Sequence, residues 1–463
     1  MSPEQQYLTV LSEQFQVLSG KHDSDKIREL LDDQNISDVA ELINDMPDRE
    51  IEIIEHLSIH RAASTFKILD HTTQKRIIRE LPPYKIVELL NELPADDRTS
   101  FLEELPSEAV KELVKLLDPE ERRVTLSLLG YKEGSVGRLM TPDYIAVFKD
   151  WTVHEVLDHI RTHGKDSETI DVIYVIDEHG RLIDDVRIRE FLLASPEKLV
   201  SEVMDGRYIS LNVNDEETMA NDVFKMNNRV ALPVVDDHNI LLGIVTIDDV
   251  LWVTTEAFSE DMQKMGGTEA LDEPYLEMPL FRLFKKRIGW LVVLFLGEML
   301  TATAMGFFQN EIEKAVVLAL FVPLIISSGG NSGSQAATLI IQALAVGDIT
   351  LRDWWRIMRR EILSGLMLGA VLGTVGFLRI ATWSLFSTIY GPHWMMVGLT
   401  VGTALIGVVL WGTLAGSMLP LLLKRLGADP AVSSAPFIAT LVDVTGLIIY
   451  FSVAYIFLQG VFL

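Results

Sequence analysis

Five long apolar segments after residue 280 constrain the fold of this chain more than any other feature. They run over residues 288–308, 315–344, 362–386, 394–423 and 437–458. A helix of about 20 apolar residues crosses the roughly 30 Å hydrocarbon layer of a bilayer, and buried helices of soluble proteins are rarely this long and this poor in charge. We therefore expect a transmembrane domain of five helices over residues 281–463, with membrane lipid as a partner.

The basic residues between these segments indicate how the helices are oriented. They gather before the first segment, between the second and third, and after the fourth: Arg282, Lys285, Lys286, Arg287, Arg352, Arg356, Arg359, Arg360, Lys424 and Arg425. Loops rich in Lys and Arg stay on the cytosolic side, and the alternate loops carry only Lys314. We expect a multi-pass protein of the cell inner membrane, with its N-terminus in the cytosol and its C-terminus outside.

The first 280 residues carry the negative charge of the chain. Their formal net charge is −30, whereas residues 281–463 carry +4. Such a surface repels nucleic acid and anionic headgroups and attracts divalent cations, so no nucleic-acid partner is expected. The absence of cysteine excludes disulfides and thiolate metal sites. The polar N-terminus has no basic region followed by an apolar stretch, and no signal peptide is expected.

A Leu-Pro repeat marks the region before residue 136. It recurs about every 12 residues, at Leu81-Pro82, Leu93-Pro94, Leu105-Pro106 and, one residue late, Leu117-Asp118-Pro119. Proline suits the first turn of a helix, and Leu, Ile and Val recur between the prolines at helical intervals. After an N-terminal extension over residues 1–35, residues 36–136 are expected to form a stack of short helices. A generic helical bundle is the alternative, and either would be a scaffold.

A weaker duplication follows over residues 137–200 and 201–254. Residues 139–145 recur as residues 203–209, and residues 172–177 recur as residues 232–236. Each copy reads as strand, amphipathic helix, apolar strand, Asp-rich turn, strand and helix. This pattern resembles a tandem pair of CBS (cystathionine-β-synthase-like) modules.

The adenosine-binding signature of that module is present in the second copy only. It reads Gly243, Thr246 and Asp249 there, and the resemblance implies ATP or another adenosine nucleotide near Thr246 and Asp249. The first copy, Ile183 to Arg189, lacks both the glycine and the hydroxyl residue, which argues against adenosine binding in that half.

Residues 255–280 join this pair to the apolar segments. Residues 254–265 predict an amphipathic helix, whose acids Glu260 and Asp261 are either its solvated face or functional groups.

Ionisable residues are few within the apolar segments. Asp443 lies about a third of the way along the fifth segment, where an ionised carboxylate costs several kcal/mol unless it faces water, a cation or a partner. It is either an ion-path ligand or a protonated or hydrogen-bonded structural residue. For Glu298, in the first segment, packing and a place at a pore rim are equally open.

The second segment contains a run of small and polar residues over 327–338. Small residues allow close helix packing, and they also allow a helix to open and turn carbonyls toward a water-filled path. Pro323 removes a helical hydrogen bond just before the run and predicts a kink. Asn331 and Gln335 are four residues apart and share one face, which we expect toward protein or water rather than lipid.

The order of these parts, together with two motifs, resembles the MgtE magnesium channels. The motifs are Gly-Gly-Asn-Ser-Gly-Ser-Gln-Ala-Ala-Thr-Leu over residues 329–339 and Ala-Thr-Leu-Val-Asp-Val-Thr-Gly over residues 439–446. The resemblance implies a multidomain fold: an all-α superhelical N-domain, α/β tandem CBS domains, a linker (plug) helix and a five-helix α transmembrane domain. It also implies a homodimer with one pore on its two-fold axis.

The resemblance also implies sites, residue by residue. The pore carboxylate falls on Asp443, and the neighbouring pore positions are Gly329, Gly330, Asn331 and Ala439. The acids that match regulatory Mg2+ sites are Asp96, Asp97, Glu217, Asp249, Glu260 and Asp261. The chain departs from the family pattern at Trp252, Ala435 and Gln309, where members can carry an acid, a polar residue and a Glu, so single regulatory sites and the selectivity can differ.

The expected function is a Mg2+-selective channel or transporter for uptake, closed when cytosolic Mg2+ bridges the acidic N and CBS domains. Mg2+ keeps several waters and binds through one or two carboxylates, which suits one Asp per subunit. The alternatives are a Co2+, Mn2+ or Ni2+ transporter, an ion-coupled exporter, and a membrane-anchored nucleotide sensor. An enzyme is not expected, because the sequence has no nucleophile–base set, phosphate loop or His-rich metal motif.

Overall fold

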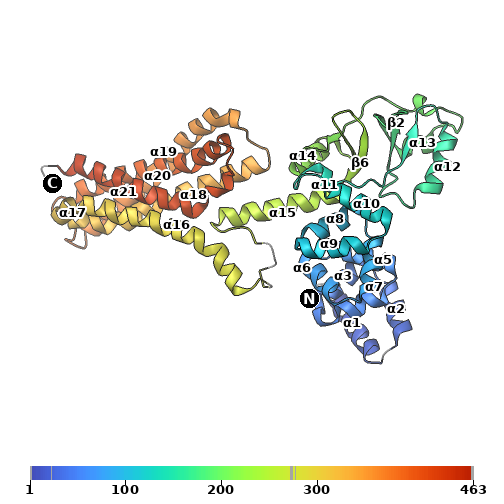
Figure 1. The fold of residues 1–463 in the computed structure, drawn as a ribbon. Coiled ribbons are helices and arrows are strands. Elements are labelled where there is room, and N and C mark those ends of the chain that lie inside the picture. Colours follow the sequence, from blue (N-terminus) through green and yellow to red (C-terminus); the bar gives the residue numbers. More distant parts are fainter. Residues whose placement is uncertain (1–2, 22, 272–274, 277, 460–463) are drawn as a thin grey trace. The chain divides into compact units, whose positions relative to one another are not determined.

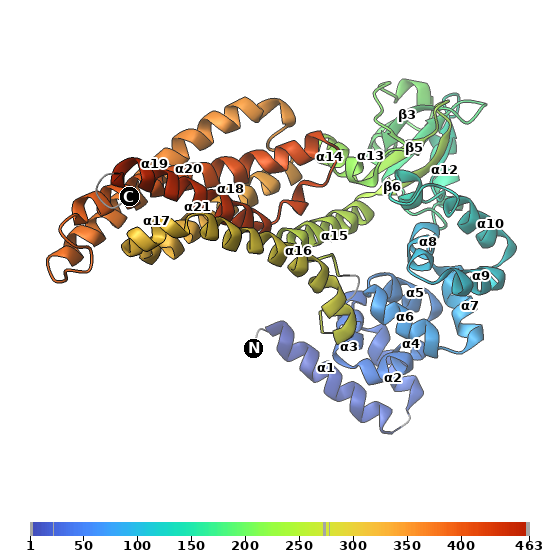
Figure 2. The same ribbon diagram turned by 60° about the vertical axis from the view of Figure 1, so that its left-hand side comes forward.

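The computed structural model describes residues 3–21, 23–271, 275–276 and 278–459. The chain divides into two compact units, Met1–Thr255 and Glu256–Leu463, which are coloured blue to green and yellow to red in Figures 1 and 2. Each unit has a hydrophobic core of its own.

The first unit begins with a stack of short helices, as the repeat predicts. They are α1 (Pro3–Ser19), α2 (Ser24–Asp32), α3 (Ile36–Asp45), α4 (Glu50–His56), α5 (Ile59–Lys67), α6 (His71–Glu80), α7 (Pro83–Glu92), α8 (Ala95–Glu103), α9 (Ser107–Leu116) and α10 (Pro119–Leu128). Helices α1 and α2 pack on this stack, because Phe15 and Leu31 are fully buried in the same core as Phe66 and Phe101.

The Leu-Pro repeat sets the boundaries of the last four of these helices. Pro82, Pro94 and Pro106 are the N-cap residues of α7, α8 and α9, and Pro119 is the first residue of α10. Proline has no N–H and a fixed φ, so it ends the preceding helix and fits the start of the next. One helix per repeat follows from the sequence alone.

Two similar α/β modules complete the first unit. After α11 (Val136–Leu139), the first holds β1 (Ala146–Phe148), α12 (Val153–His163), β2 (Val172–Ile176), β3 (Leu182–Arg187) and α13 (Ile188–Leu193); the second holds β4 (Leu211–Asn212), α14 (Glu217–Asn227), β5 (Ala231–Val235) and β6 (Leu241–Thr246). In each three-stranded sheet the middle strand pairs parallel with the first and antiparallel with the third.

The Asp-rich turns make the duplication visible at atomic level. Asp177 Oδ1 accepts hydrogen bonds from the backbone N–H groups of the second and fourth residues after it, and Asp236 Oδ1 does the same. Gly180 and Asn239 take the same turn position with φ of 77° and 63°, in the left-handed region that Gly and Asn enter at least cost. The expected order of elements in both CBS copies is confirmed.

Helix α15 (Ile247–Met265) follows β6 directly. It contains the amphipathic helix expected over residues 254–265 and begins seven residues before it. The second unit then contains α16 (Leu280–Phe307), α17 (Gln309–Lys314), α18 (Val322–Ala345), α19 (Trp354–Ser384), α20 (Trp394–Arg425) and α21 (Ala435–Leu458). Five of its helices are long and apolar enough to cross a membrane. In both views α18, α20 and α21 run side by side (Figures 1 and 2).

The structure corrects the expectation for Pro323 and decides between the alternatives for the small-residue run of the second apolar segment. Pro323 does not kink a helix, because α18 begins at Val322 and its proline lies in the first turn; a 3-10 helix, Val316–Phe321, precedes it. The run of small residues does not open the helix either, since α18 is continuous through it.

Glycine lets α18 and α20 touch backbone to backbone. A Cβ atom built on Gly412 would lie 2.4 Å from the carbonyl oxygen of Gly329, and one on Gly416 would lie 2.1 Å from that of Gly333. These distances are far below van der Waals contact, so each helix contributes a small-x-x-x-small pair to the crossing. The packing alternative therefore holds for Gly329 and Gly333.

Candidate functional site: an ion path and an acidic junction

Asp443 lies in the first half of α21, one turn after Ala439, and faces Gly330 of α18. A Cβ atom built on Gly330 would lie 3.4 Å from the Cβ of Ala439 and 3.5 Å from Oδ1 of Asp443. The glycine thus brings the α18 backbone into contact with the turn that carries the carboxylate. The structure brings together Gly330, Ala439 and Asp443.

Two other residues expected near the path lie on different faces of α18. Gly329 packs inward, since its Cβ would lie 2.4 Å from Val408 and 2.8 Å from Val442. Asn331 is exposed, and its Nδ2 donates to Ser327 Oγ at 3.4 Å. Gln335, one turn further on, is exposed too. The polar face expected from their spacing is therefore an exposed face of this chain.

Hydrogen bonds from two other helices fix the beginning of α21. Its N-cap residue Ser434 accepts a hydrogen bond from Trp290 Nε1 of α16 at 3.1 Å. Ser334 Oγ of α18 donates to the carbonyl oxygen of Ala435 at 2.9 Å. These bonds hold the helix that carries Asp443, and sequence reasoning missed them because they join residues about a hundred or more positions apart.

Glu298 is the second acid of the spanning helices near this point. A Cβ on its neighbour Gly297 would lie 2.8 Å from Thr440 Cγ2, so α16 packs directly on α21. The Glu298 side chain itself is exposed, and its carboxylate acts electrostatically on Asp443. Its exposure argues against the packing alternative.

A second group of acids gathers within the first unit. Asp96 and Asp97 lie in the first turn of α8, Glu168 lies in the loop before β2, and Asp248 and Asp249 lie in the first turn of α15. These carboxylates act electrostatically on one another, and we call the five of them the acidic junction. It joins the helical N-domain to both CBS copies. The sequence indicated Asp96, Asp97 and Asp249 but gave no signal for Glu168 or Asp248.

Burial and mutual repulsion make the charged form of the junction carboxylates unfavourable. Asp96 is 6 % exposed, and its Oδ1 has no hydrogen-bond partner among the residues that the structure describes. Burial, assisted by Asp249 and Asp97, raises the pKa of Asp96 well above its ordinary value. Burial, together with Asp248, raises the pKa of Asp249 to about 7, although Thr246 Oγ1 donates to its carboxylate at 2.5 Å. Unneutralised carboxylates therefore oppose close contact between these domains.

An ammonium group also faces the junction. Nζ of Lys67, the last residue of α5, lies 3.4 Å from Asp97 Oδ2 and 4.0 Å from Glu168 Oε1. Burial alone would lower the pKa of Lys67, but Asp97 and then Glu168 outweigh burial and raise it. Sequence reasoning missed Lys67, because an isolated lysine at a helix end carries no signal of its partners.

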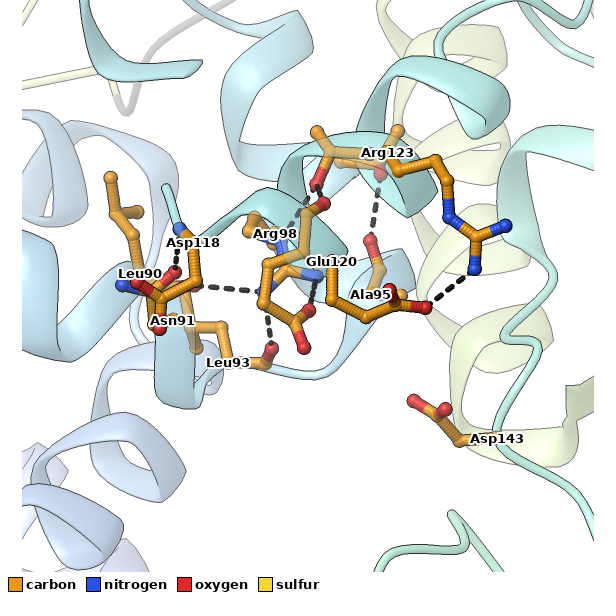
Figure 3. A network of polar contacts seen from close by, with 12 residues as sticks. Leu90, Asn91, Leu93, Ala95, Arg98, Asp118, Glu120, Arg123 and Asp143 are labelled. Carbon is orange, nitrogen blue, oxygen red and sulfur yellow. Dashed lines mark hydrogen bonds and ion pairs between the residues drawn. The ribbon is translucent and has the colours of Figure 1, made fainter. Parts of the chain in front are cut away.

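A buried arginine organises the helix that supplies Asp96 and Asp97. Arg98 is fully buried, and its guanidinium donates to the carbonyl oxygens of Leu90 and Leu93, to Thr125 Oγ1 at 2.9 Å and to Glu121 of α10 (Figure 3). These bonds join the end of α7, the start of α8 and α10. The bonds of Arg98 to α7 and α10 thus fix the orientation of the first turn of α8.

The far end of α15 carries a cluster of its own within the second unit. Lys264 Nζ lies 2.8 Å from Glu260 Oε1 and 2.9 Å from Asp429 Oδ2, in the loop between α20 and α21. Burial, assisted by Asp429, raises the pKa of Asp261. Glu260 and Asp261 therefore face a charged partner of the spanning unit, and the reading of them as a merely solvated face is not supported.

The first CBS copy differs from its repeat at the signature positions. Asp184 takes the position of Gly243, as the strand pairing shows, and its buried carboxylate accepts three backbone N–H bonds, from Asp185, Asp205 and Gly206. A cavity of about 400 Å³ lies beside it, lined by Asp185, Val186, Arg187, Glu190, Val203, Asp205 and Arg229. Asp185 and Arg229 form an ion pair at 2.7 Å.

The lining of this cavity does not fit a free triphosphate. Its carboxylates outnumber its two guanidinium groups, and one of these is already neutralised by Asp185.

In the second copy the Thr246 hydroxyl donates a hydrogen bond to the Asp249 carboxylate. Glu217 begins α14 of that copy. Among the described residues, no three His, Asp or Glu side chains enclose a metal-sized site.

Comparison with known proteins shows which family the chain belongs to. Residues 322–453 match a divalent cation transporter family, residues 34–134 the MgtE intracellular N domain, and residues 136–197 and 200–254 the CBS domain. The magnesium transporter MgtE of Thermus thermophilus is 40 % identical over 351 residues, which cover 76 % of each chain. The chain belongs to the MgtE family.

Two further relatives extend this result. The magnesium transporter MgtE of Bacillus subtilis is 26 % identical over 94 % of each chain. A crystal structure of the cytosolic domain of the Mg2+ channel MgtE in complex with ATP is 32 % identical, covers 52 % of this chain and 99 % of that one, and has a TM-score of 0.50. The expected family and the expected N-domain, CBS pair and spanning helices are confirmed; a family of transporters is not a class of enzymes.

Proposed function

We propose that this chain carries Mg2+ through a pore of the cell inner membrane and that Asp443 is the carboxylate that attracts the ion. The carrying observation is Asp443 facing the glycine backbone of α18 at Gly330, in a chain 40 % identical to a magnesium transporter. Mg2+ retains several waters and accepts one or two carboxylates. Two chains in a homodimer would supply two such groups, and weak outer-shell binding would let the ion leave again.

The substitution Asp443→Asn tests the pore assignment, since it keeps the shape and removes the charge. A unit charge about 4 Å from a divalent ion contributes on the order of 2 to 8 kcal/mol, so Mg2+ flux into proteoliposomes should fall about tenfold or more. The matched control is Asp348→Asn, the same change at an exposed loop position between α18 and α19. Control-level flux in a well-folded Asp443→Asn protein would refute the assignment.

We also propose that residues 1–280 sense cytosolic Mg2+ and close the pore. Residues 36–136, 137–200 and 201–254 would bear the sensing acids, including Glu217, and residues 255–280 would couple them to residues 281–463. The acidic junction carries more carboxylates than its ammonium neutralises, so a bridging divalent ion would stabilise a closed arrangement. A ligand shifts such an equilibrium by its difference in affinity for the two states.

The sensing proposal is tested by open probability against cytosolic Mg2+. Asp249→Asn, Glu260→Gln and Asp261→Asn combined should leave the pore open at Mg2+ concentrations that close the native protein, without a change in conductance. A variant lacking residues 1–130 should behave similarly. Closure of both at the native Mg2+ concentration would contradict the proposal.

Transport of Co2+, Mn2+ or Ni2+ and ion-coupled export are competing functions. Flux of each cation, with and without proton and sodium gradients, separates them from a Mg2+ channel. The proposed orientation, with the N-terminus in the cytosol and the C-terminus outside, is open to cysteine labelling. Because the chain has no cysteine, single introduced cysteines in the loops report their side of the membrane directly.

An adenosine nucleotide is a second candidate ligand of the CBS pair. It is favoured by the likeness to the cytosolic domain crystallised with ATP, while the lining of the first-copy cavity opposes it. Calorimetric titration with ATP and with adenosine distinguishes a nucleotide site from a site that reads only the nucleoside. No heat with either would remove this candidate.

A further inference from the structure

The acidic junction contains a cation that belongs to the chain itself. Lys67 extends from the end of α5 in the N-domain, and the two carboxylate oxygens nearest its Nζ come from different domains: Asp97 from the N-domain and Glu168 from the first CBS copy. The three side chains are 19–29 % exposed, so solvent screens them only partly. The ammonium therefore bridges the same two domains that a divalent ion would bridge.

The remaining charges of the junction are not satisfied by this one ammonium. Asp96 is buried with an unpartnered Oδ1, and Asp97, Glu168 and Asp249 all act on it. Arg98, the buried cation that follows Asp97 in the chain, donates its guanidinium to Glu121 and to the carbonyl oxygens of Leu90 and Leu93. The junction thus keeps an excess of carboxylates, with one position already filled by a tethered charge.

We propose that Lys67 is a built-in cation of the acidic junction, which holds the place of one divalent ion between Asp97 and Glu168 and so sets how many ions must bind before the domains close. The inference rests on the proposed Mg2+ sensing. Because the ammonium cannot diffuse away, it contributes attraction at all Mg2+ concentrations. A mobile ion contributes only when it is present, and it adds to the steepness of the response.

Removing the ammonium should therefore make closure depend more strongly on Mg2+. In Lys67→Met, Asp97 and Glu168 repel one another without Mg2+, so the open state is more populated and the protein should be cleaved about three to ten times faster by protease. With Mg2+ the freed position should take up one more ion per chain. The slope of protection against the logarithm of free Mg2+ should rise by about one ion.

The experiment uses the full-length protein in detergent, with limited proteolysis over a series of free Mg2+ concentrations. Electron paramagnetic resonance of Mn2+ counts the bound ions in parallel. Lys67→Arg keeps the charge and should retain the native slope and count. Lys75→Met is the matched control, because Lys75 pairs with Glu104 at 3.1 Å within the N-domain, away from the junction.

The outcomes separate the inference from the proposed function. If the native protein gains no protection from Mg2+, both are overturned. If the native protein and Lys75→Met respond, and Lys67→Met shows the same slope and the same Mn2+ count, only the role of Lys67 is overturned. A Lys67→Arg variant that behaves like Lys67→Met also overturns it, because the charge would then not be the cause. A steeper Lys67→Met response with one additional Mn2+ supports it.

Discussion

The substitution Gly416→Ala tests whether the backbone contact between α18 and α20 positions the candidate ion path. An alanine Cβ at this position would lie 2.1 Å from the carbonyl oxygen of Gly333 and 2.8 Å from its carbonyl carbon. A carbon–oxygen contact needs about 3.3 Å, so the helices must separate locally by about 1 Å. The obstructing atoms are backbone and cannot rotate away.

The expected loss follows from two opposing contributions. Overpacking a well-packed contact costs about 1–3 kcal/mol and occasionally more, and a rigid backbone obstruction places Gly416→Ala at the upper end. Alanine favours a helix over glycine by up to about 1 kcal/mol. The net destabilisation should therefore be about 2 kcal/mol. Mg2+ flux should also fall, because a shift of α18 at Gly333 also moves Gly330, three residues earlier, which contacts the turn of α21 that carries Asp443.

The assay is chemical unfolding of the full chain in detergent, followed by tryptophan fluorescence, together with flux in proteoliposomes. Gly289→Ala is the control, because its Cβ would meet no atom within 4 Å, and its unfolding midpoint should stay or rise. If Gly416→Ala and Gly289→Ala unfold at the same midpoint and conduct alike, the glycine contact does not set the position of α18, and the reasoning is refuted.

Three further predictions concern the first unit and the linker helix. With the pKa of Asp249 near 7, lowering the pH from about 8 to about 6 protonates it and removes repulsion; the junction should then resist protease better without Mg2+, and Asp249→Asn should abolish this pH step. Arg98→Met removes the donor to the partly exposed Glu121 and to two buried carbonyls and should destabilise the N-domain by about 1–3 kcal/mol, measured by urea unfolding. Lys264→Met breaks a partly exposed pair with Asp429 worth at most about 1 kcal/mol, so stability should hardly change while the Mg2+ concentration that closes the pore shifts.

The sequence predicts much of this fold because the length of an apolar segment and the position of a proline act on neighbouring residues alone. The five spans follow from the need of a helix in lipid to satisfy its own backbone, and α7 to α10 begin where proline cannot continue a helix. The same rules leave Pro323 ambiguous, since a proline can kink a helix or begin one. The structure resolves it, because the residues before Pro323 form a separate 3-10 turn.

The candidate site is less predictable, because its contacts join distant positions. The sequence offers two roles for the glycine run of α18, and only the arrangement of α20 and α21 assigns them by face: Gly329 and Gly333 pack on α20, while Gly330 faces Asp443. Likewise Lys67 and Glu168 are a hundred residues apart. Because acids are spread over all of residues 1–280, the sequence cannot show which carboxylates meet.

The two sites are connected by one continuous helix. Helix α15 carries Asp248 and Asp249 of the acidic junction in its first turn, and Lys264 directly precedes its last residue, Met265. Beyond its end, Gly267 has a φ of 74°, and a Cβ there would meet the Trp290 indole at 2.8 Å and Pro436 at 3.3 Å.

These contacts leave little freedom between the end of α15 and the ion path. The indole of Trp290 also bonds to Ser434, the N-cap of α21, and Lys264 binds Asp429 just before that cap. Asp443 lies nine residues after Ser434, about 14 Å along the same helix. Because a packed helix moves as a rigid body, a displacement of α15 that carries Lys264 and Trp290 must tilt α21 at its cap and shift Asp443 relative to Gly330. We predict that α15 transmits closure of the junction only while it stays helical. A glycine pair introduced midway along α15 should then preserve Mg2+ binding and protease protection while uncoupling both from pore closure.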